Sequence, residues 1–182
     1  MYEQLKDSHI IKTMVKEHDH ILKILDELQS LSRQLSVDDQ NNGSVLIRKI
    51  HELSNKIISA EPHHQREEKV LFPAMEKKGL SGPTKCMTLE HEVMRKIKHD
   101  LKNETINNKQ NWKDQIDLIS QLISNLCNNL RQHIEKENNV LYPMALKFIT
   151  EDKEWNEMKI ECDEIGYCCF CPTNNKELNK SI

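Results

Sequence analysis

The chain has 182 residues, with 26 Lys and Arg against 29 Asp and Glu and a formal net charge of -3. This length can bury one hydrophobic core without disulfides, and the scarcity of Gly, Pro and aromatic residues favours helices over sheets. The interspersed charges give no basic patch for nucleic acid, no apolar run approaches the ~20 residues that span a bilayer, and the N-terminus lacks a signal-peptide core. We therefore expect an all-α, cytoplasmic protein that binds neither nucleic acid nor membranes.

The first half of the chain predicts two helices. Apolar residues recur at three- and four-residue steps over 8–35, and His18 falls on that apolar line. The polar segment 37–43 is expected to be a loop. Ser44 is then expected to be the N-cap of a second helix over 45–78, in which a proline at position 62 predicts a kink.

The second half predicts two more helices. Gly and Pro turn the chain over 77–84, and Pro83 suits the first turn of a third helix. After a loop at 103–111, the fourth helix carries His133 and Glu137 inside its apolar stripe. That stripe consists of Ile119, Leu122, Leu126, Leu130, Val140, Leu141 and Met144.

Short connections between four long amphipathic helices predict an up-down-up-down antiparallel four-helix bundle over residues 8–150. Residues 151–182 are expected to add a short helix at 151–161 and a cysteine-rich C-terminal tail.

The two halves are related by an internal repeat. The segment HHQREEKVLFP (63–73) matches HIEKENNVLYP (133–143), 70 residues later. The pair Glu17-His18 matches Glu90-His91, 73 residues later, so each half offers one lone His and one His-x-x-x-Glu. Side chains four residues apart on a helix lie one turn above each other and can therefore reach the same metal pair.

This repeat predicts six metal ligands on apolar helix faces. They are His18, His63, Glu67, His91, His133 and Glu137. A single core histidine is more often structural, but six such groups in phase with four helices are costly to bury unless cations neutralise them. Nitrogen and oxygen donors favour iron, manganese or zinc over copper(I), and bridging carboxylates favour iron. Zinc and a mixed pair stay open.

The remaining histidines and the repeat aromatics are expected to serve other purposes. His64 is interpreted as supporting or packing, because the repeat aligns it with an isoleucine, and His51 lies about 120° from His63 on an unbroken helix. Solvated or surface positions are expected for His9, His20 and His99, and core positions for Phe72 and Tyr142.

The His, then His-x-x-x-Glu pattern resembles the hemerythrin/HHE cation-binding family over residues 10–148. The resemblance implies that the six predicted ligands hold two Fe ions bridged by Glu67, Glu137 and an oxo or hydroxo group. Oxygen-carrying members have a further His one turn after the third-helix ligand, where this chain has Arg95. That departure weakens the prediction of reversible oxygen carriage and leaves room for redox chemistry.

The cysteine-rich tail leaves three interpretations open. Its thiols belong to Cys162, Cys168, Cys169 and Cys171. Such a cluster suits a second metal site for iron or zinc, a redox dithiol, or an unstructured segment.

The leading hypothesis is a non-haem di-iron protein that binds oxygen, nitric oxide or peroxide for sensing, scavenging or delivery. The alternative is a di-iron redox enzyme or iron donor in peroxide or nitric oxide detoxification or iron–sulfur cluster repair. Either activity calls for a redox partner protein, and the sequence leaves open whether the protein is an enzyme.

Overall fold

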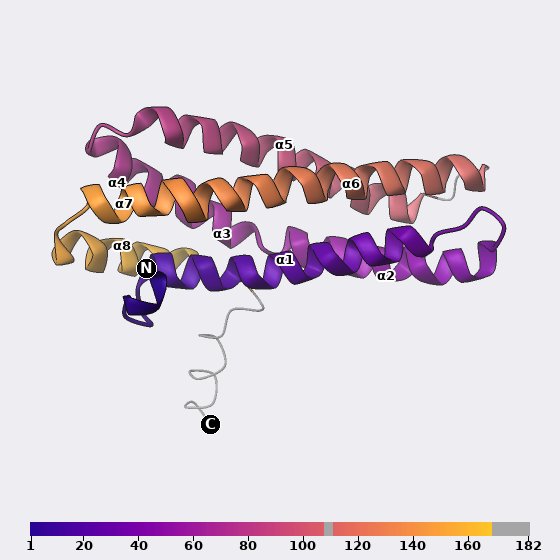
Figure 1. Ribbon diagram of the computed structural model, residues 1–182, viewed down its shortest axis with the longest axis horizontal. Helices are drawn as coiled ribbons and strands as arrows, with labels where there is room; N and C mark the ends of the chain where they lie inside the picture. The colour runs from indigo at the N-terminus through magenta and orange to yellow at the C-terminus, as the bar shows by residue number, and fades with distance from the viewer. Residues whose placement is uncertain (108–110, 169–182) are drawn as a thin grey trace, which may run out of the picture. The chain divides into compact units, whose positions relative to one another are not determined.

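The computed structural model describes residues 1–107 and 111–168, and no strand occurs within those two stretches. Figure 1 traces the helices in chain order from indigo to yellow. They are η1 (Tyr2–Gln4), α1 (Ile10–Gln34), α2 (Gln40–Ile58), α3 (Glu61–Arg66), η2 (Glu67–Leu71), α4 (Phe72–Lys77), α5 (Ser81–Ile106), α6 (Trp112–Lys136), η3 (Glu137–Leu141), α7 (Tyr142–Phe148) and α8 (Asp152–Ile165). The prediction of an all-α, hemerythrin-like helical bundle is confirmed.

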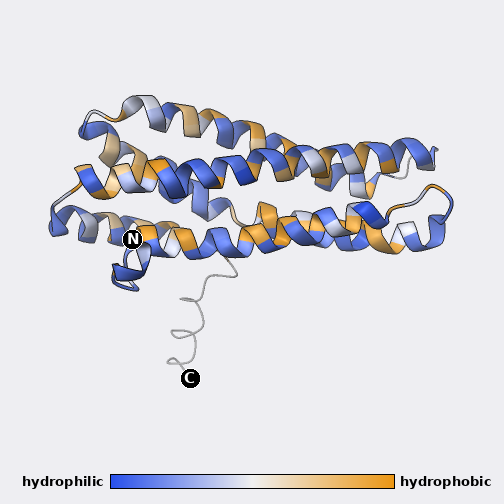
Figure 2. Ribbon diagram, in the orientation of Figure 1, coloured by the Kyte–Doolittle hydropathy of each residue, from blue (hydrophilic) through white to orange (hydrophobic). Residues whose placement is uncertain are grey.

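The helices form two compact units, and α1, α5 and α6 each contribute residues to both. The first unit comprises Met1–His20, Ser59–Leu89 and Ile134–Ile182, and the second comprises Ile21–Ile58 and Glu90–His133. Figure 2 shows hydrophilic and hydrophobic residues alternating along the helices, as expected where one face is buried.

The first unit has a core built from α1, η2, α4, α7 and α8. Its fully or nearly fully buried members include Ile11, Met14, Leu71, Met75, Ala145, Met158 and Cys162. The short helix expected at 151–161 is α8, which extends to Ile165 and packs against α3 and η2. Because α8 supplies Met158 and Cys162 to this core, it is part of the first unit and not an appendage.

The second unit buries residues from α1, α2, α5 and α6. Its most buried side chains include Leu25, Leu28, Ile50, Met94, Leu101, Ile119 and Leu126. Two contacts join α6 to α1 here: the Cys127 thiol lies 3.6 Å from the Leu25 carbonyl oxygen, and Arg131 Nη2 lies 2.6 Å from Asp26 Oδ1.

The start of α2 differs from the prediction, because the helix begins at Gln40 and Ser44 lies inside it. The N-cap is Asp39, whose Oδ1 accepts the Asn42 N–H at 3.1 Å. Gly43, expected in a loop, is a buried helical residue. A Cβ there would lie 2.3 Å from the Trp112 ring, so only glycine fits.

The single helix expected over 45–78 is divided into α2, α3, η2 and α4. The chain leaves helical geometry at Ser59 and Ala60, and Pro62 lies in the first turn of α3, where its missing N–H costs nothing. Pro62 therefore starts a new helix and does not kink a continuous one. By contrast, α5 begins at Ser81 with Pro83 in its first turn, as predicted.

Two π-helical segments, η2 and η3, occupy equivalent positions of the internal repeat. Each begins at a predicted ligand carboxylate: the Phe72 N–H donates to the Glu67 carbonyl, and the Tyr142 N–H donates to the Glu137 carbonyl. A proline directly follows each of these two aromatic residues. Single-turn π segments of this kind often occur at functional sites.

Among the residues that the structure describes, no helix is both long and apolar enough to cross a membrane.

Candidate metal centre

Predicted ligands converge inside the first unit, where all are buried. His18 Nε2 lies 3.0 Å from His63 Nε2 and 3.1 Å from Glu137 Oε2. One donor atom from each of these three residues lies within 4.8 Å of the others. That spacing suits three ligands of one ion, because metal bonds to imidazole nitrogen and carboxylate oxygen measure about 2.0–2.2 Å.

The outer nitrogens of this imidazole pair are both held by acceptors. His18 Nδ1 lies 2.9 Å from Asn138 Oδ1, and His63 Nδ1 lies 2.7 Å from Glu17 Oε2. Each Nδ1–H therefore donates to an oxygen, and each Nε2 is left with a lone pair. Two lone pairs that face each other at 3.0 Å in a buried site repel unless a cation lies between them. These donors fit a metal ion.

Glu67 is the fourth predicted ligand in this unit. Its Oε2 lies 3.7 Å from His63 Nε2, and its Oε1 accepts a hydrogen bond of 2.6 Å from the Tyr142 hydroxyl. The Tyr142 ring stacks on His18, with centroids 5.7 Å apart and planes 6° apart. Burial and the Glu137 and Glu67 carboxylates hold the pKa of Tyr142 well above its usual value, so the hydroxyl keeps its proton and donates.

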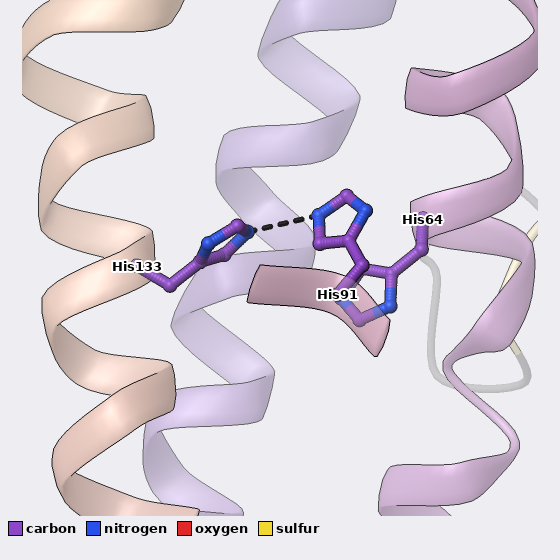
Figure 3. A group of neighbouring side chains, drawn as sticks. All are labelled: His64, His91 and His133. Atoms are coloured by element: carbon purple, nitrogen blue, oxygen red, sulfur yellow. Dashed lines mark hydrogen bonds between the residues drawn. The ribbon is translucent and has the colours of Figure 1, made fainter. Parts of the chain in front are cut away.

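The second unit holds the other two predicted ligands in the same arrangement. His91 Nε2 lies 2.9 Å from His133 Nε2, the contact drawn as a dashed line in Figure 3. His133 Nδ1 lies 2.8 Å from Glu90 Oε2. Glu90 is thus to His133 what Glu17 is to His63, as the internal repeat requires.

The Glu17 carboxylate is completely buried and bound by two partners. It accepts hydrogen bonds from His63 Nδ1 and from Nη2 of Arg66, itself fully buried. Burial raises the pKa of Glu17, but the hydrogen bond from His63 and the charges of His63 and Arg66 lower it to about 2. Burial also lowers the pKa of His63 to about 4, against the opposing effect of Glu17, so its Nε2 is neutral near pH 7.

The chain after α8 packs against this network. Tyr167 lies with its ring centroid 4.6 Å from the Arg66 guanidinium carbon. The Cys168 N–H donates to Glu17 Oε1 at 3.4 Å, and the Cys168 thiol lies 3.6 Å from the Ala60 carbonyl oxygen. Residues 167 and 168 therefore close one side of the Glu17–Arg66 pair.

The described cysteines of the tail are buried thiols. Burial raises the pKa of Cys162 to about 12 and raises that of Cys168 as well, so both keep their protons near pH 7. Neither has the thiolate character of a metal ligand or an active redox thiol in this state. The other two candidates, Cys169 and Cys171, lie outside the described residues.

The remaining histidines have varied surroundings. His64 is buried, with its ring edge-on to His63 and its Nδ1 3.8 Å from Glu61. His51 lies in the second unit, where its Nδ1 is 2.8 Å from the Thr105 hydroxyl.

His9 differs from the expected surface position. It is half-buried against Trp155, and its Nδ1 accepts the Ile11 N–H at the start of α1. His20 is half-buried and His99 is exposed.

Several polar residues around the ligands were not singled out from the sequence: Glu17, Arg66, Glu90, Asn138 and the hydroxyl of Tyr142. The repeated Glu-His pair was a usable signal for Glu17 and Glu90, because a residue repeated with its ligand neighbour often supports that ligand. Arg66 and Asn138 have no counterpart of the same type in the other half of the repeat.

Imidazole pairs with oriented outer nitrogens and buried carboxylates define a helical, histidine- and carboxylate-based cation-binding protein. The family described as hemerythrin HHE cation binding domain matches residues 9–145. The chain belongs to that family.

Curated relatives carry the name iron-sulfur cluster repair protein YtfE. The protein from Enterobacter sp. (strain 638) is 33% identical over 151 residues, which cover 76% of this chain and 64% of that protein. The one from Escherichia coli O1:K1 / APEC is 38% identical over 94 residues, covering 46% of this chain and 40% of that protein. The chain thus spans less than two thirds of these relatives' length.

Proposed function

We propose that this protein holds two iron ions with His18, His63, Glu67, His91, His133 and Glu137, and that it binds oxygen, nitric oxide or peroxide for sensing, scavenging or delivery. The observation that carries the proposal is the pair of buried Nε2–Nε2 contacts at 3.0 and 2.9 Å, each with an outer nitrogen held by a carboxylate.

The supporting residues favour iron as the resident metal. Glu17 and Glu90 hold His63 and His133 in the tautomer that presents Nε2, and a carboxylate on the outer nitrogen raises the basicity of the imidazole. Imidazole and carboxylate donors without a thiolate suit iron, manganese or zinc. Membership of the HHE family supports iron among these.

The chain's contribution is to bind the metal pair, leave coordination positions open and exclude bulk water. When bound, ferrous iron supplies electrons to a small ligand at an open position. Six protein residues do not fill the coordination shells of two ions, and Arg95 gives no imidazole at the position where oxygen carriers have a further one. Leu71, Phe72 and Met75 form an apolar core in the first unit that keeps water from its ligands.

A second candidate function is iron supply for iron–sulfur cluster repair, which two observations favour. Relatives that cover 76% of this chain bear that name. In addition, the Cys168 N–H binds Glu17, so a cysteine-bearing segment directly contacts the residue that orients His63.

Metal analysis tests the proposed centre. Iron-reconstituted wild-type protein should contain two ions per chain, and His63→Ala and His133→Ala should each lower that content. His99→Ala, at an exposed position, is the matched control and should leave it unchanged. Equal iron content in all four proteins would show that these imidazoles do not bind the metal.

Stopped-flow spectroscopy and an iron-transfer assay separate the two candidate functions. For a small-ligand binder, the anaerobically reduced protein should change colour within milliseconds to seconds of mixing with oxygen or nitric oxide and retain its iron. An iron donor should instead lose iron to an apo-ferredoxin supplied with sulfide, and cluster absorbance should grow as its own iron falls.

A further inference from the structure

Tyr142 differs from its repeat counterpart by one atom. The repeat aligns Tyr142 with Phe72, and both are buried in the first unit. Only Tyr142 has a hydroxyl, and this hydroxyl donates to Glu67 Oε1 at 2.6 Å. Two carboxylates that the repeat makes equivalent are therefore not chemically equivalent, because Phe72 has no donor to offer.

The hydrogen bond leaves Glu67 little freedom. A bond of this length to an ionised carboxylate is among the stronger kinds in proteins. Because Tyr142 occupies Oε1, the other oxygen, Oε2, is the one that lies 3.7 Å from His63 Nε2. The carboxylate is thereby oriented with one defined oxygen toward the imidazole.

The tyrosine is itself fixed in place. Its side chain is completely buried, and its ring stacks nearly parallel on His18, with centroids 5.7 Å apart. The same residue thus contacts two predicted ligands from different helices, His18 through its ring and Glu67 through its hydroxyl. A shift of Tyr142 would disturb both.

We propose that Tyr142 is a positioning residue that orients Glu67 toward the metal and makes the two ligand carboxylates unequal. This inference rests on the proposed metal centre. The hydroxyl withdraws electron density from Glu67, so Glu67 donates less charge to its ion than Glu137 does. The two ions of the centre are consequently inequivalent, although the ligand residues themselves repeat.

Tyr142→Phe tests the inference with zinc, which is redox-silent. Loss of a hydrogen bond to a ligating carboxylate typically lowers metal affinity about 10–100-fold. We expect that loss in a chelator competition assay, at an unchanged saturating stoichiometry. The carboxylate band assigned to Glu67, identified by its absence in Glu67→Gln, should also shift in the infrared spectrum of the metal-free variant.

Tyr167→Phe is the matched control, because it also removes a hydroxyl that donates to a carboxylate, that of Asp163, in the same unit. It should leave zinc affinity and the Glu67 band unchanged. If Tyr142→Phe lowers the melting temperature but moves neither affinity nor the band, Tyr142 is a packing residue and the inference is wrong.

The infrared comparison of the metal-free proteins separates this inference from the proposed function. A wild-type protein that binds neither iron nor zinc would overturn the proposed centre. A Glu67 band that stays in place in metal-free Tyr142→Phe would overturn the positioning role, whatever the metal content of the wild type.

Discussion

The two imidazole pairs have the same hydrogen bond but different surroundings. His63 is held by Glu17 at 2.7 Å in the first unit, and His133 by Glu90 at 2.8 Å in the second. The Glu17 side chain is 0% exposed and paired with Arg66, whereas that of Glu90 is 28% exposed. The repeat thus conserves the contact that orients the imidazole, while burial of the supporting carboxylate differs between the halves.

The origin of this difference lies outside the repeat. Position 66 aligns with Lys136, which is exposed, and the first unit alone contains α8 with Tyr167 and Cys168 after it. These residues cover the Glu17–Arg66 pair and exclude water from it. We infer that the first half is rigid and sensitive to charge changes, and that the second half tolerates them.

Arg66→Met should produce the largest effect, because it leaves the Glu17 carboxylate buried without its cation. Removing one partner of a buried ion pair typically costs about 3–5 kcal/mol. Lys136→Met, at the equivalent exposed position, should change the free energy of unfolding by less than about 0.5 kcal/mol. Urea unfolding of both variants measures the contrast, and equal losses would contradict it.

Acid should destabilise the metal-free protein through the first half. The pKa of His63 is lowered from 6.5 to about 4, so the unfolded chain takes up a proton that the folded chain refuses as the pH falls through that interval. The pKa of Glu17, lowered from 4.5 to about 2, extends the loss to lower pH. Each group should contribute about 3 kcal/mol when its loss is complete.

Urea unfolding at pH 7, 5.5 and 4 checks the His63 contribution, and a flat profile would show that His63 is not buried in its neutral form. The double variant Glu17→Gln with Arg66→Met removes both charges of the buried pair together. It should lack the additional loss below pH 4.5 while keeping the loss above it.

Glu90→Gln isolates the orienting hydrogen bond without the burial. Its acceptor is partly exposed, so metal affinity should fall about 10-fold with little change in stability. Glu17→Gln should lower affinity about 100-fold and also destabilise the fold, because Arg66 loses its counter-charge. Chelator competition and thermal unfolding measure both, and the same result at the two sites would remove the asymmetry.

Tyr167→Leu should give the smallest effect. It removes the ring from the Arg66 guanidinium, an interaction worth about 1 kcal/mol in a partly desolvated setting. Tyr167→Phe keeps the ring and should retain that stability, so the difference between the two variants in thermal unfolding reports the cation–π contact.

Hydrophobic periodicity was sufficient to predict the helical fold and the region of each long helix, since burial of one face is a property of the whole segment. It failed at α2, where Asp39 and not Ser44 caps the helix and Trp112 makes room for Gly43 in the helix interior. Such contacts join residues distant in sequence.

The candidate site shows the same division. The positions of the six predicted ligands follow from the repeat, and their ligation stays a prediction. The Glu17–Arg66 pair and the Tyr142 hydroxyl could not be predicted, because each depends on which helices pack together. The cysteine tail was read as separate, whereas Cys162 and Cys168 are buried in the first unit.

The π segments make the chain unusually sensitive to its length at two places. Each segment accommodates one residue more than an α-helical turn, so the histidine before it and the aromatic residue after it keep their phase only with that extra residue present. Deleting a single residue from η2, such as Val70, would rotate everything that follows by about 100° relative to His63. Substitutions within η2 and η3 should therefore be tolerated more often than single-residue deletions, and a relative that lacks one residue there is not expected to keep the site.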